Sequence, residues 1–318
     1  MTARIAIVGA GAAGLACASA LRRQGLRPVV FEKSRSFGGR IATRRRDGLQ
    51  FDHGAQALTC AGDPLLAQAR ASGDVTRWDA ATEADGAAPW IGSPRMKDGL
   101  ASLLPGLDIH YATEIKSVLH RGGAWEIATG AERQTFDLVA LAAASEQSLR
   151  LLDPSETELR GALEQVIFEP CHALMVAFER PPAWPEVQPA PPDPFTWIAH
   201  EGSKPGRSQE PAAFVAHTTA AWSAAHLDTP SEEVARALLA ALGVALGPLP
   251  PVLLAMGHRW RLARATRPLG RPCAASRDGT LLAGGDWALG RTVADALVSG
   301  RAMAEALHQR TLAQVDNG

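Results

Sequence analysis

The hydrophobic pattern is clearest in the first 32 residues, where it predicts a strand, a helix and a second strand. Residues 4–8 form a short apolar run rich in β-branched side chains, which is typical of a buried strand. Residues 12–23 are rich in Ala and Leu and predict a helix that Gly25 ends as a C-cap. Residues 28–32 predict the next strand, so this stretch is typical of an α/β fold.

Further along the chain, strand-like and helix-like patterns follow one another. Alternating apolar residues predict one strand over 107–120, a hairpin turn at Gly122 and Gly123, and strands at 125–129 and 136–141. Helical patterns cover 63–76, 145–166 and 231–242, whereas later strands are predicted at 171–179, 195–200, 212–219 and 258–265, and 280–307 predicts a strand, a G-G-D turn and a final helix.

Composition and charge narrow the possible functions. Apolar residues make up 46% of the chain and charged residues 20%, which is ordinary for a globular protein. The net charge of −1 gives no reason to expect a nucleic-acid or anionic-membrane partner. No apolar run approaches the ~18 residues of a membrane span. We also see no signal-peptide pattern, so we expect a cytoplasmic protein.

The four cysteines, Cys17, Cys60, Cys171 and Cys273, are scattered along the chain. They form no C-x-x-C pair and no Cys/His cluster with metal-ligand spacing. We therefore expect reduced cysteines and no metal site.

Three glycines between the first strand and helix form the first candidate binding motif. Gly9, Gly11 and Gly14 have G-x-G-x-x-G spacing, which permits a tight turn, close approach of a pyrophosphate, and close helix–strand packing. The pyrophosphate would lie at the helix N-terminus, where N–H groups and the dipole favour an anion. Glu32 can accept from both ribose hydroxyls of an adenosine, and an acid there argues against a 2′-phosphate. The predicted contacts are Gly9, Gly11, Ala12, Ala13, Gly14, Glu32 and Lys33.

A second motif, Gly38, Gly39 and Arg40, follows the second strand. Adjacent glycines let the backbone bend under a phosphate, and the arginine can add a charge-assisted hydrogen bond. Together with the first motif and Glu32, it resembles flavoproteins of the amine oxidase superfamily, in which these three elements bind FAD. No cysteine lies near the final helix in sequence, so the resemblance implies FAD bound without a covalent link.

Residues 41–59, IATRRRDGLQFDHGAQALT, are similar to the renalase branch of that superfamily. The resemblance implies that the backbone of Gly54, Ala55 and Gln56 lies beside the isoalloxazine ring. Ala57 departs from the pattern, because the residue after the glutamine is usually aromatic in that branch. A wider or differently shaped pocket is therefore implied.

The resemblance also implies cofactor contacts late in the chain. In the family, one strand places backbone groups against the adenine, and Ile115 or Lys116 is the matching candidate. Gly285 and Asp286 match a G-D motif that contacts the ribityl chain or a phosphate. The final helix, beginning near Val293, would direct its positive dipole end at the flavin ring. Asp295 stands where the family usually has a small residue, so its carboxylate would oppose that dipole unless it points to solvent.

Hydride transfer to a flavin needs a C–H group held over N5 in a water-poor pocket and few catalytic side chains. His217 matches an H-T-T segment of renalase-like sequences, and Trp222 and Trp287 are candidate pocket walls. Trp260 is a weaker candidate, and nothing in the sequence argues that Lys204 is catalytic. No Ser-His-Asp spacing or carboxylate pair is evident.

Three hypotheses of function remain open. The first is an FAD-dependent oxidase of the renalase type, which takes a hydride from an isomeric dihydronicotinamide nucleotide to flavin N5 and reduces O₂ to H₂O₂. The second is a flavin amine oxidase or desaturase on the same scaffold, which the scarcity of tyrosine disfavours, since only Tyr111 is present. The third is a flavin- or nucleotide-binding protein without turnover. The expected partners are a small-molecule substrate and O₂, with no nucleic acid and no membrane.

The predicted fold class is α/β, with a Rossmann-like FAD-binding domain and a second, mixed-sheet α+β substrate domain. The FAD-binding domain is expected to be discontinuous, over 1–62, 105–150 and 255–318. The substrate domain is expected over 63–104 and 151–254.

Overall fold

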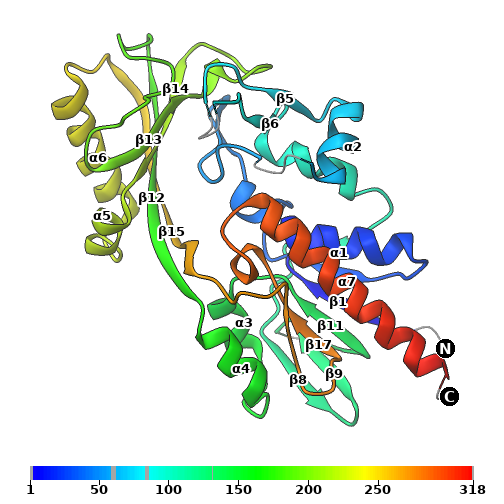
Figure 1. Cartoon of the computed structure of the whole chain (residues 1–318). Helices are drawn as coiled ribbons and strands as arrows, with labels where there is room; N and C mark the ends of the chain where they lie inside the picture. Colours follow the sequence, from blue (N-terminus) through cyan, green and yellow to red (C-terminus); the bar gives the residue numbers. More distant parts are fainter. Residues whose placement is uncertain (1–2, 59–61, 83–85, 131, 317–318) are drawn as a thin grey trace.

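The computed structural model describes residues 3–58, 62–82, 86–130 and 132–316, and it forms two units joined by long strands (Figure 1). A six-stranded sheet with the order β16-β17-β11-β1-β2-β7 organises the first unit, and all its neighbouring strands are parallel except β16 and β17. The predicted α/β class is therefore confirmed. The strands are β1 (Ile5–Val8), β2 (Val29–Phe31), β7 (Asp108–His110), β11 (Leu138–Leu141), β16 (Ala274–Ala275) and β17 (Leu281–Ala283).

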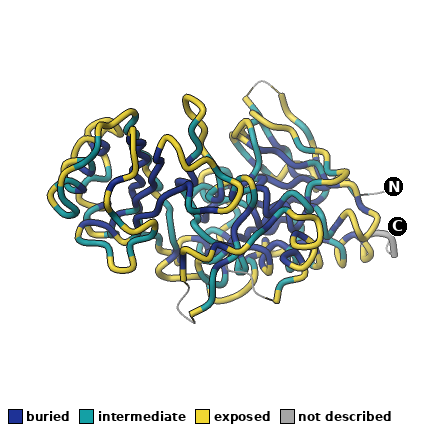
Figure 2. Tube along the Cα trace, turned by 90° about the horizontal axis from the view of Figure 1, so that it is seen from above, coloured by how far each residue is buried: buried dark blue, intermediate teal, exposed yellow. Residues whose placement is uncertain are grey.

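Both faces of this sheet are buried, as parallel sheets require. Ile5 and Ile7 point into a core shared with α1 (Ala12–Arg23) and α7 (Val293–Asp316), whereas Val8 points into a second core on the opposite face. Figure 2 shows the buried chain running through the interior of the unit. The second core is covered by β8 (Ser117–Arg121), β9 (Ala124–Ala128), β10 (Arg133–Phe136), α3 (Ser145–Leu151) and α4 (Thr157–Glu164).

The second unit is a four-stranded antiparallel sheet with the order β13-β14-β12-β15. One face packs on α5 and α6, and the other face packs through Met175 and Val215 on Phe51 of the first unit. Two short strands, β3 and β4, form the hairpin that ends at Phe51. The bounds are β3 (Arg44–Arg46), β4 (Leu49–Phe51), β12 (Ile167–Phe178), β13 (Phe195–His200), β14 (Ala212–Thr218), α5 (Ala220–Ala225), α6 (Ser231–Leu246) and β15 (Val252–Arg267).

Residues 62–82 and 86–104, which lie between β4 and β7 in sequence, pack on the first unit. Leu66, Ile91 and Leu100 lie in the same core as α1. The predicted helix over 63–76 ends early, because Gly73 adopts a left-handed conformation with φ +77° and a strand follows. The elements are α2 (Pro64–Ser72), β5 (Val75–Arg77), β6 (Trp90–Gly92) and the 3₁₀ helix η2 (Met96–Leu103).

The single strand predicted over 107–120 is wrong. The chain forms β7 in the first sheet, leaves it through a loop, and then forms β8 in the antiparallel sheet. Ala112 in this loop has a φ of +53°, and its N–H donates to the carbonyl of Ser34. The strand predicted over 136–141 is likewise divided, because Asp137 leaves both ladders and binds the backbone of Arg4.

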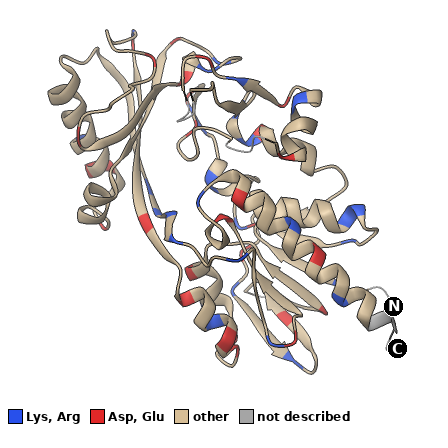
Figure 3. Ribbon diagram, viewed as in Figure 1, with Lys and Arg blue, Asp and Glu red and all other residues tan. Residues whose placement is uncertain are grey.

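Residue 255, the expected start of the last part of the first domain, lies inside β15. Because β15 pairs with β12 along the second sheet, we propose that this boundary follows residue 267. We also propose that 63–104 belongs to the first domain, whose core it shares. Basic and acidic residues are interspersed over both units (Figure 3). No helix in the described part of the chain has the length and apolar character to cross a bilayer.

Candidate functional site

Helix α1 begins at the glycine turn without a capping side chain and without an acid in its first turn. A Cβ atom on Gly11, the N-cap residue, would have no heavy atom within 4 Å. The other side of the turn is crowded, since Gly9 has a φ of +109° and a Cβ atom on Gly14 would lie 1.9 Å from the Gly9 carbonyl oxygen. The turn therefore leaves open space beside an uncapped, positive helix end, as an anion-binding turn requires.

Glu32 is fixed at the end of β2 and is 5% exposed. Its Oε2 accepts from the Ala10 amide and its Oε1 from the Ser34 amide, both at 2.8 Å. Each carboxylate oxygen keeps a further lone pair, so Glu32 can still accept from ribose hydroxyls. Lys33 is exposed beside it, and its predicted contact stays a prediction.

The second glycine motif lies directly against the first. The Gly38 amide donates to the Ala10 carbonyl at 2.9 Å, and a Cβ atom on Gly39 would lie 3.5 Å from Cα of Gly11. Both Gly38 and Gly39 have left-handed backbone conformations, with φ of +116° and +56°, which side chains would strain. The two motifs thus form one continuous glycine-lined wall around the end of α1.

Arg40 joins this wall to the C-terminal motif. Its Nη2 lies 2.5 Å from Oδ1 of Asp286, and its Nη1 lies 3.0 Å from Oδ2 of the same carboxylate. Nη1 also donates to the Ala263 carbonyl at 3.0 Å. Arg40 and Asp286 were predicted to contact the cofactor separately, and the structure brings them together as a bidentate pair.

The segment Gly54–Ala55–Gln56 lies against Arg40. The Ala55 amide donates to the Arg40 carbonyl at 2.9 Å, and a Cβ atom on Gly54 would lie 1.9 Å from that same oxygen. Only glycine therefore allows this contact at position 54. The three motifs predicted from the sequence to share one cofactor meet at Arg40.

The start of α7 is capped, in contrast to that of α1. Asp295 Oδ2 accepts from the amide of Thr292 at 2.8 Å, and the Asp295 amide donates to Thr292 Oγ1 at 3.1 Å. These reciprocal bonds form a capping box, so Asp295 is held against its own backbone and does not point freely into solvent. The N–H group of Val293, in the first helical turn, is left without an intrahelical acceptor. Gly285 donates to Ser299 Oγ at 2.9 Å, which ties the G-D turn to α7.

Ile115 lies in the loop before β8 and not in a strand, because the chain changes sheets there. Its side chain is 6% exposed and packs in the core that contains Phe31. A backbone contact of Ile115 with an adenine stays a prediction.

His217, on β14, contacts the backbone just before Gly54 and lies close to three residues that sequence reasoning ranked low or missed. Its Nε2 lies 3.1 Å from the His53 carbonyl oxygen, and the Trp260 Nε1 donates to the same oxygen at 2.8 Å. The ring of His53 stacks on Trp260 with centroids 5.2 Å apart, and His258 lies edge-on to both. An atom of the Trp260 ring lies 3.4 Å from the Cβ position of Gly54. We term His53, His217, His258 and Trp260 the imidazole wall.

Burial keeps the imidazole wall uncharged. It lowers the pKa of His53 and of His217 to about 4, and that of His258 to about 3. The guanidinium of Arg44 lowers the pKa of His53 and His258 further, and that of Arg264 acts on His217 in the same sense. All three imidazoles are therefore neutral at pH 7.

We expect the free energy of unfolding to fall as the pH is lowered from 6.5 towards 4, because the unfolded chain takes up protons that the folded imidazoles do not. Each imidazole adds a slope of about 1.4 kcal/mol per pH unit within its window. His217→Gln, which keeps a donor for the His53 carbonyl, should remove one such slope in urea unfolding measured across this range. An unchanged slope would show that His217 is not buried as a neutral group.

The structure corrects the two tryptophan predictions. Trp222 lies on α5, behind the second sheet, where it stacks on His226 with centroids 3.9 Å apart. His217 lies on the opposite face, because side chains alternate along β14. Trp287 is 0% exposed in the second core, where its Nε1 donates to the Ala143 carbonyl at 2.9 Å. Neither indole belongs to the imidazole wall.

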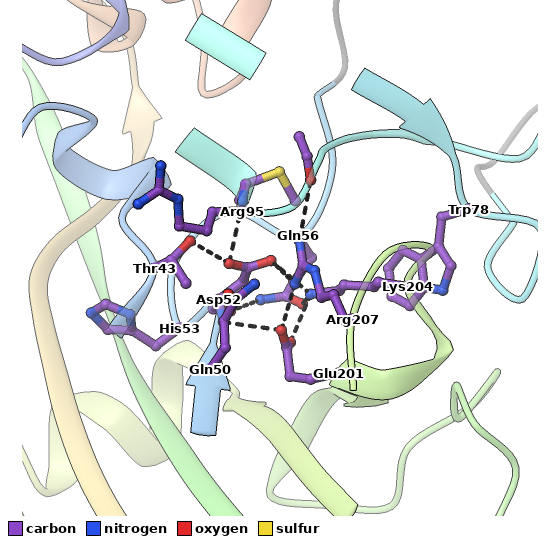
Figure 4. Close-up of polar contacts among 12 residues, drawn as sticks. Thr43, Gln50, Asp52, His53, Gln56, Trp78, Arg95, Glu201, Lys204 and Arg207 are labelled. Carbon is purple, nitrogen blue, oxygen red and sulfur yellow. Dashed lines mark hydrogen bonds and ion pairs between the residues drawn. The ribbon is translucent and has the colours of Figure 1, made fainter. Parts of the chain in front are cut away.

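Sequence reasoning missed a buried group of four charges under Gln56, formed by Asp52, Glu201, Lys204 and Arg207 (Figure 4). We term it the buried charge cluster. The Lys204 Nζ donates to Glu201 Oε1 at 2.7 Å, to Gln56 Oε1 at 3.1 Å and to Asp52 Oδ2 at 3.2 Å. All three ammonium protons therefore have acceptors.

Arg207 completes the charge balance of the cluster. Its Nη1 donates to Asp52 and, at 2.6 Å, to Glu201 Oε2, and its Nη2 donates to the Gly92 carbonyl at 3.3 Å. Thr43 donates to Asp52 Oδ1 at 2.5 Å. The cluster thus joins three segments that are far apart in sequence: the flavoprotein-like segment, the β6 region and the connector between β13 and β14.

The two carboxyl groups respond differently to this environment. Burial alone would raise the pKa of Asp52, but Lys204, Arg207 and the Thr43 hydroxyl lower it below its ordinary value. Burial raises the pKa of Glu201 above its ordinary value, and Lys204 opposes that rise. The available signal for the cluster was the polar connector EGSKPGR, in which an acid, a lysine and an arginine recur every third residue. That spacing is equally typical of a solvated loop.

The residues present fit a bound dinucleotide. The uncapped helix end, the open space at Gly11, the fixed Glu32 carboxylate and the adjoining glycine wall supply the groups that a pyrophosphate and a ribose need. The described residues contain no cluster of His, Cys, Asp and Glu suited to a metal ion. Cys17, Cys171 and Cys273 are unpaired thiols, whereas Cys60 lies outside the described residues.

Two known families match the chain. Residues 7–70 match the NAD(P)-binding Rossmann-like domain, and residues 76–308 match the family described as flavin-containing amine oxidoreductase. The two matches together include the glycine turn, the imidazole wall, the buried charge cluster and the start of α7.

Curated relatives match over short stretches. The mitochondrial protoporphyrinogen oxidase of Nicotiana tabacum is 43% identical over 56 residues, which cover 18% of this chain and 11% of that protein. The 4,4'-diapophytoene desaturase (4,4'-diaponeurosporene-forming) of Staphylococcus aureus strain Newman is 43% identical over 51 residues, 16% of this chain and 10% of that protein. The matched stretch spans about a tenth of these relatives' own length.

Solved structures match along almost the whole chain. A proposed protoporphyrinogen oxidase from Exiguobacterium sp. 255-15 superimposes with a TM-score of 0.77 at 14% identity, over 98% of this chain and 99% of that one. Putrescine oxidase bound to putrescine gives a TM-score of 0.69 at 16% identity, over 98% and 100%. Cyclohexylamine oxidase from Brevibacterium oxydans IH-35A also gives 0.69, at 12% identity, over 98% and 99%. At these identities the similarity shows the fold.

Proposed function

The chain belongs to the family of flavin-containing amine oxidoreductases, and from this premise we propose that it is an FAD-dependent oxidase of the renalase type. FAD is the cofactor, in keeping with the flavin-containing family, and we propose that it is bound without a covalent link. The substrate would be an isomeric dihydronicotinamide nucleotide. It gives up a hydride, which together with one solvent proton converts O₂ to H₂O₂, and the oxidised nicotinamide nucleotide leaves.

The charge around the imidazole wall is the observation that carries this proposal. The rings of the wall are neutral at pH 7, and the guanidinium groups of Arg44 and Arg264 act on them from outside. Among the described residues Arg44 has no ion-pair partner, whereas Arg264 pairs with Glu169 at 3.3 Å. A protonated amine would meet repulsion there, but a neutral dihydropyridine ring carrying phosphate would not.

The residues of the imidazole wall would shape the substrate pocket and exclude water from it. FAD, when bound, supplies the two-electron acceptor. His217 and Trp260 both donate to the His53 carbonyl, so the wall has one fixed orientation beside Gly54. A neutral imidazole has one donor and one acceptor, so His217, which donates to the His53 carbonyl, keeps its second ring nitrogen to accept from the carboxamide of a nicotinamide. Hydride transfer then needs no protein acid or base at the reacting carbon.

The proposal also includes a cytoplasmic location, the expectation drawn from the sequence. The unpaired thiols of Cys17, Cys171 and Cys273 suit a reducing compartment.

Anaerobic stopped-flow mixing of the FAD-loaded protein tests the proposal. We expect 2-dihydro- or 6-dihydro-NAD to bleach the flavin absorbance within a single turnover, and air to restore it with one H₂O₂ per substrate. Ordinary NADH, the 4-dihydro isomer, is the matched control and should react far more slowly.

Amine probes such as putrescine and benzylamine complete the experiment. Bleaching by an amine and not by a dihydronicotinamide would replace the proposal with an amine oxidase. A protein that holds FAD but is bleached by none of these compounds would contradict an oxidase of either kind and favour a flavin-binding protein without turnover.

A further inference from the structure

The buried charge cluster lies directly beneath the segment expected to face the flavin ring. We propose that Lys204 is a positioning residue, which fixes the Gln56 amide and through it the backbone from Gly54 to Gln56 on the flavin side of the site. The connector 201–207, which belongs to the substrate unit, thereby becomes part of the cofactor site. The proposal rests on the proposed function in that FAD is bound with its ring beside Gly54–Gln56, and it does not rest on the identity of the substrate.

Lys204 dictates which way the Gln56 amide points. An ammonium group only donates hydrogen bonds, so the Gln56 atom that lies 3.1 Å from Nζ must be the oxygen. The Gln56 nitrogen is then directed at the backbone, where it donates to the Asp52 carbonyl and, at 3.2 Å, to the Gly54 carbonyl. A side chain without charge at position 204 would remove the reason for this orientation.

A continuous series of hydrogen bonds connects Gln56 to Arg40 of the second glycine motif and to Asp286 of the C-terminal motif. The Gln56 amide holds the Gly54 carbonyl, and the Ala55 amide holds the Arg40 carbonyl at 2.9 Å. The Arg40 guanidinium then pairs with Asp286 at 2.5 Å. Displacement of Gln56 would therefore also shift the backbone of Gly54 and Ala55, which the flavin ring is expected to contact.

The burial of Lys204 favours a fixed position over a mobile one. Its side chain is 0% exposed and lies over the ring of Trp78, with Nζ 5.1 Å from the ring centroid. Its three donors are used by three acceptors, which leaves Nζ one stable arrangement. Ordered donors of this kind hold a site in its working geometry at no further entropic cost.

Two variants remove the contact while keeping buried charge balanced. Gln56→Met deletes the acceptor and leaves all four charges in place. The double variant Lys204→Met/Glu201→Gln deletes the donor together with one acid, so that the Asp52–Arg207 pair stays neutral overall. Arg133→Met/Glu126→Gln likewise removes one cation and one acid, but from a surface ion pair on the β9–β10 hairpin, and is the control.

We expect both variants, compared with the control, to shift the flavin absorption bands and the flavin midpoint potential. Hydrogen exchange of the backbone at Gly54–Gln56 should accelerate, with FAD and without it. Reduction of the flavin by a dihydronicotinamide isomer should slow about tenfold or more, with a larger change in kcat than in KM, because misplacement affects the reacting geometry.

A purely structural role for Lys204 gives a different result. Flavin bands, potential and hydrogen exchange at Gly54–Gln56 would then match the control in both variants, even if the double variant unfolds more easily, and the proposal would be overturned. These three measurements need no substrate. They therefore decide the role of Lys204 even if the protein oxidises something other than a dihydronicotinamide.

Discussion

Gly11→Asp is expected to abolish FAD binding while leaving the FAD-free protein at least as stable as the parent. Gly11 has an extended backbone, with φ −79° and ψ −176°, and a side chain there meets open space, so aspartate fits without strain. As an N-cap residue it would accept from the free N–H groups of α1 and add a few tenths of a kcal/mol. A carboxylate ~4 Å from a phosphate charge costs about 4 kcal/mol at an effective dielectric constant near 20. That is roughly a thousandfold in affinity.

The measurement pairs thermal unfolding of the FAD-free protein with FAD titration followed by flavin fluorescence. Gly11→Ser is the control, because serine caps the helix without adding charge, and it should lose much less affinity than aspartate. Should the aspartate variant purify yellow, with FAD bound near the wild-type affinity, the pyrophosphate does not lie at this turn.

Lys204→Met as a single change is expected to lower the free energy of unfolding by about 3–5 kcal/mol, because it leaves two buried carboxylates facing one arginine. The side chains of Asp52 and Glu201 are 0% and 2% exposed, so water does not replace the lost ammonium. Total stabilities of about 5–15 kcal/mol are usual, so this is a large fraction. Urea unfolding of the FAD-free protein measures it.

Lys116→Met is the matched control for this change. Lys116 pairs with Glu114 at the surface and is 56% exposed, so its loss should cost no more than about 0.5 kcal/mol. Adding Glu201→Gln to Lys204→Met should recover part of the loss, because the remaining acid and arginine balance. If the single and double variants were equally stable, burial of an unpaired charge would not be the cause.

The local parts of the site could be predicted from the sequence, because each depends on neighbouring residues. Spacing alone located the glycine turn, and Glu32 followed from the end of the second strand. The family resemblance assigned both glycine motifs to one cofactor, and in the structure they adjoin, since a Cβ atom on Gly39 would lie 3.5 Å from Cα of Gly11. Trp287, in contrast, adjoins a predicted contact in sequence but points into the core.

The parts that depend on distant segments could not be predicted. Asp52 and Lys204 are 152 positions apart, and neither has a local pattern that marks it as buried. Trp222 was predicted to line the pocket because it follows His217 closely in sequence. A helix begins at Ala220, however, and places Trp222 behind the sheet. The single strand predicted over 107–120 was wrong for the same reason, because it depends on distant segments. Alternation of apolar residues indicates which face of a strand is buried, but not which sheet the strand joins.

Strands β12 and β15 pair with each other from Ile167 opposite Arg267 to Phe178 opposite Val252, and they form the bridge between the two units. A bridge made of a two-stranded ribbon resists opening, because bending it would break several backbone hydrogen bonds together. Substrate entry should therefore depend on movements of surface loops and not on a domain rotation. We therefore expect the spacing between the two units to stay the same from one turnover to the next, without the closing motion of a hinged enzyme.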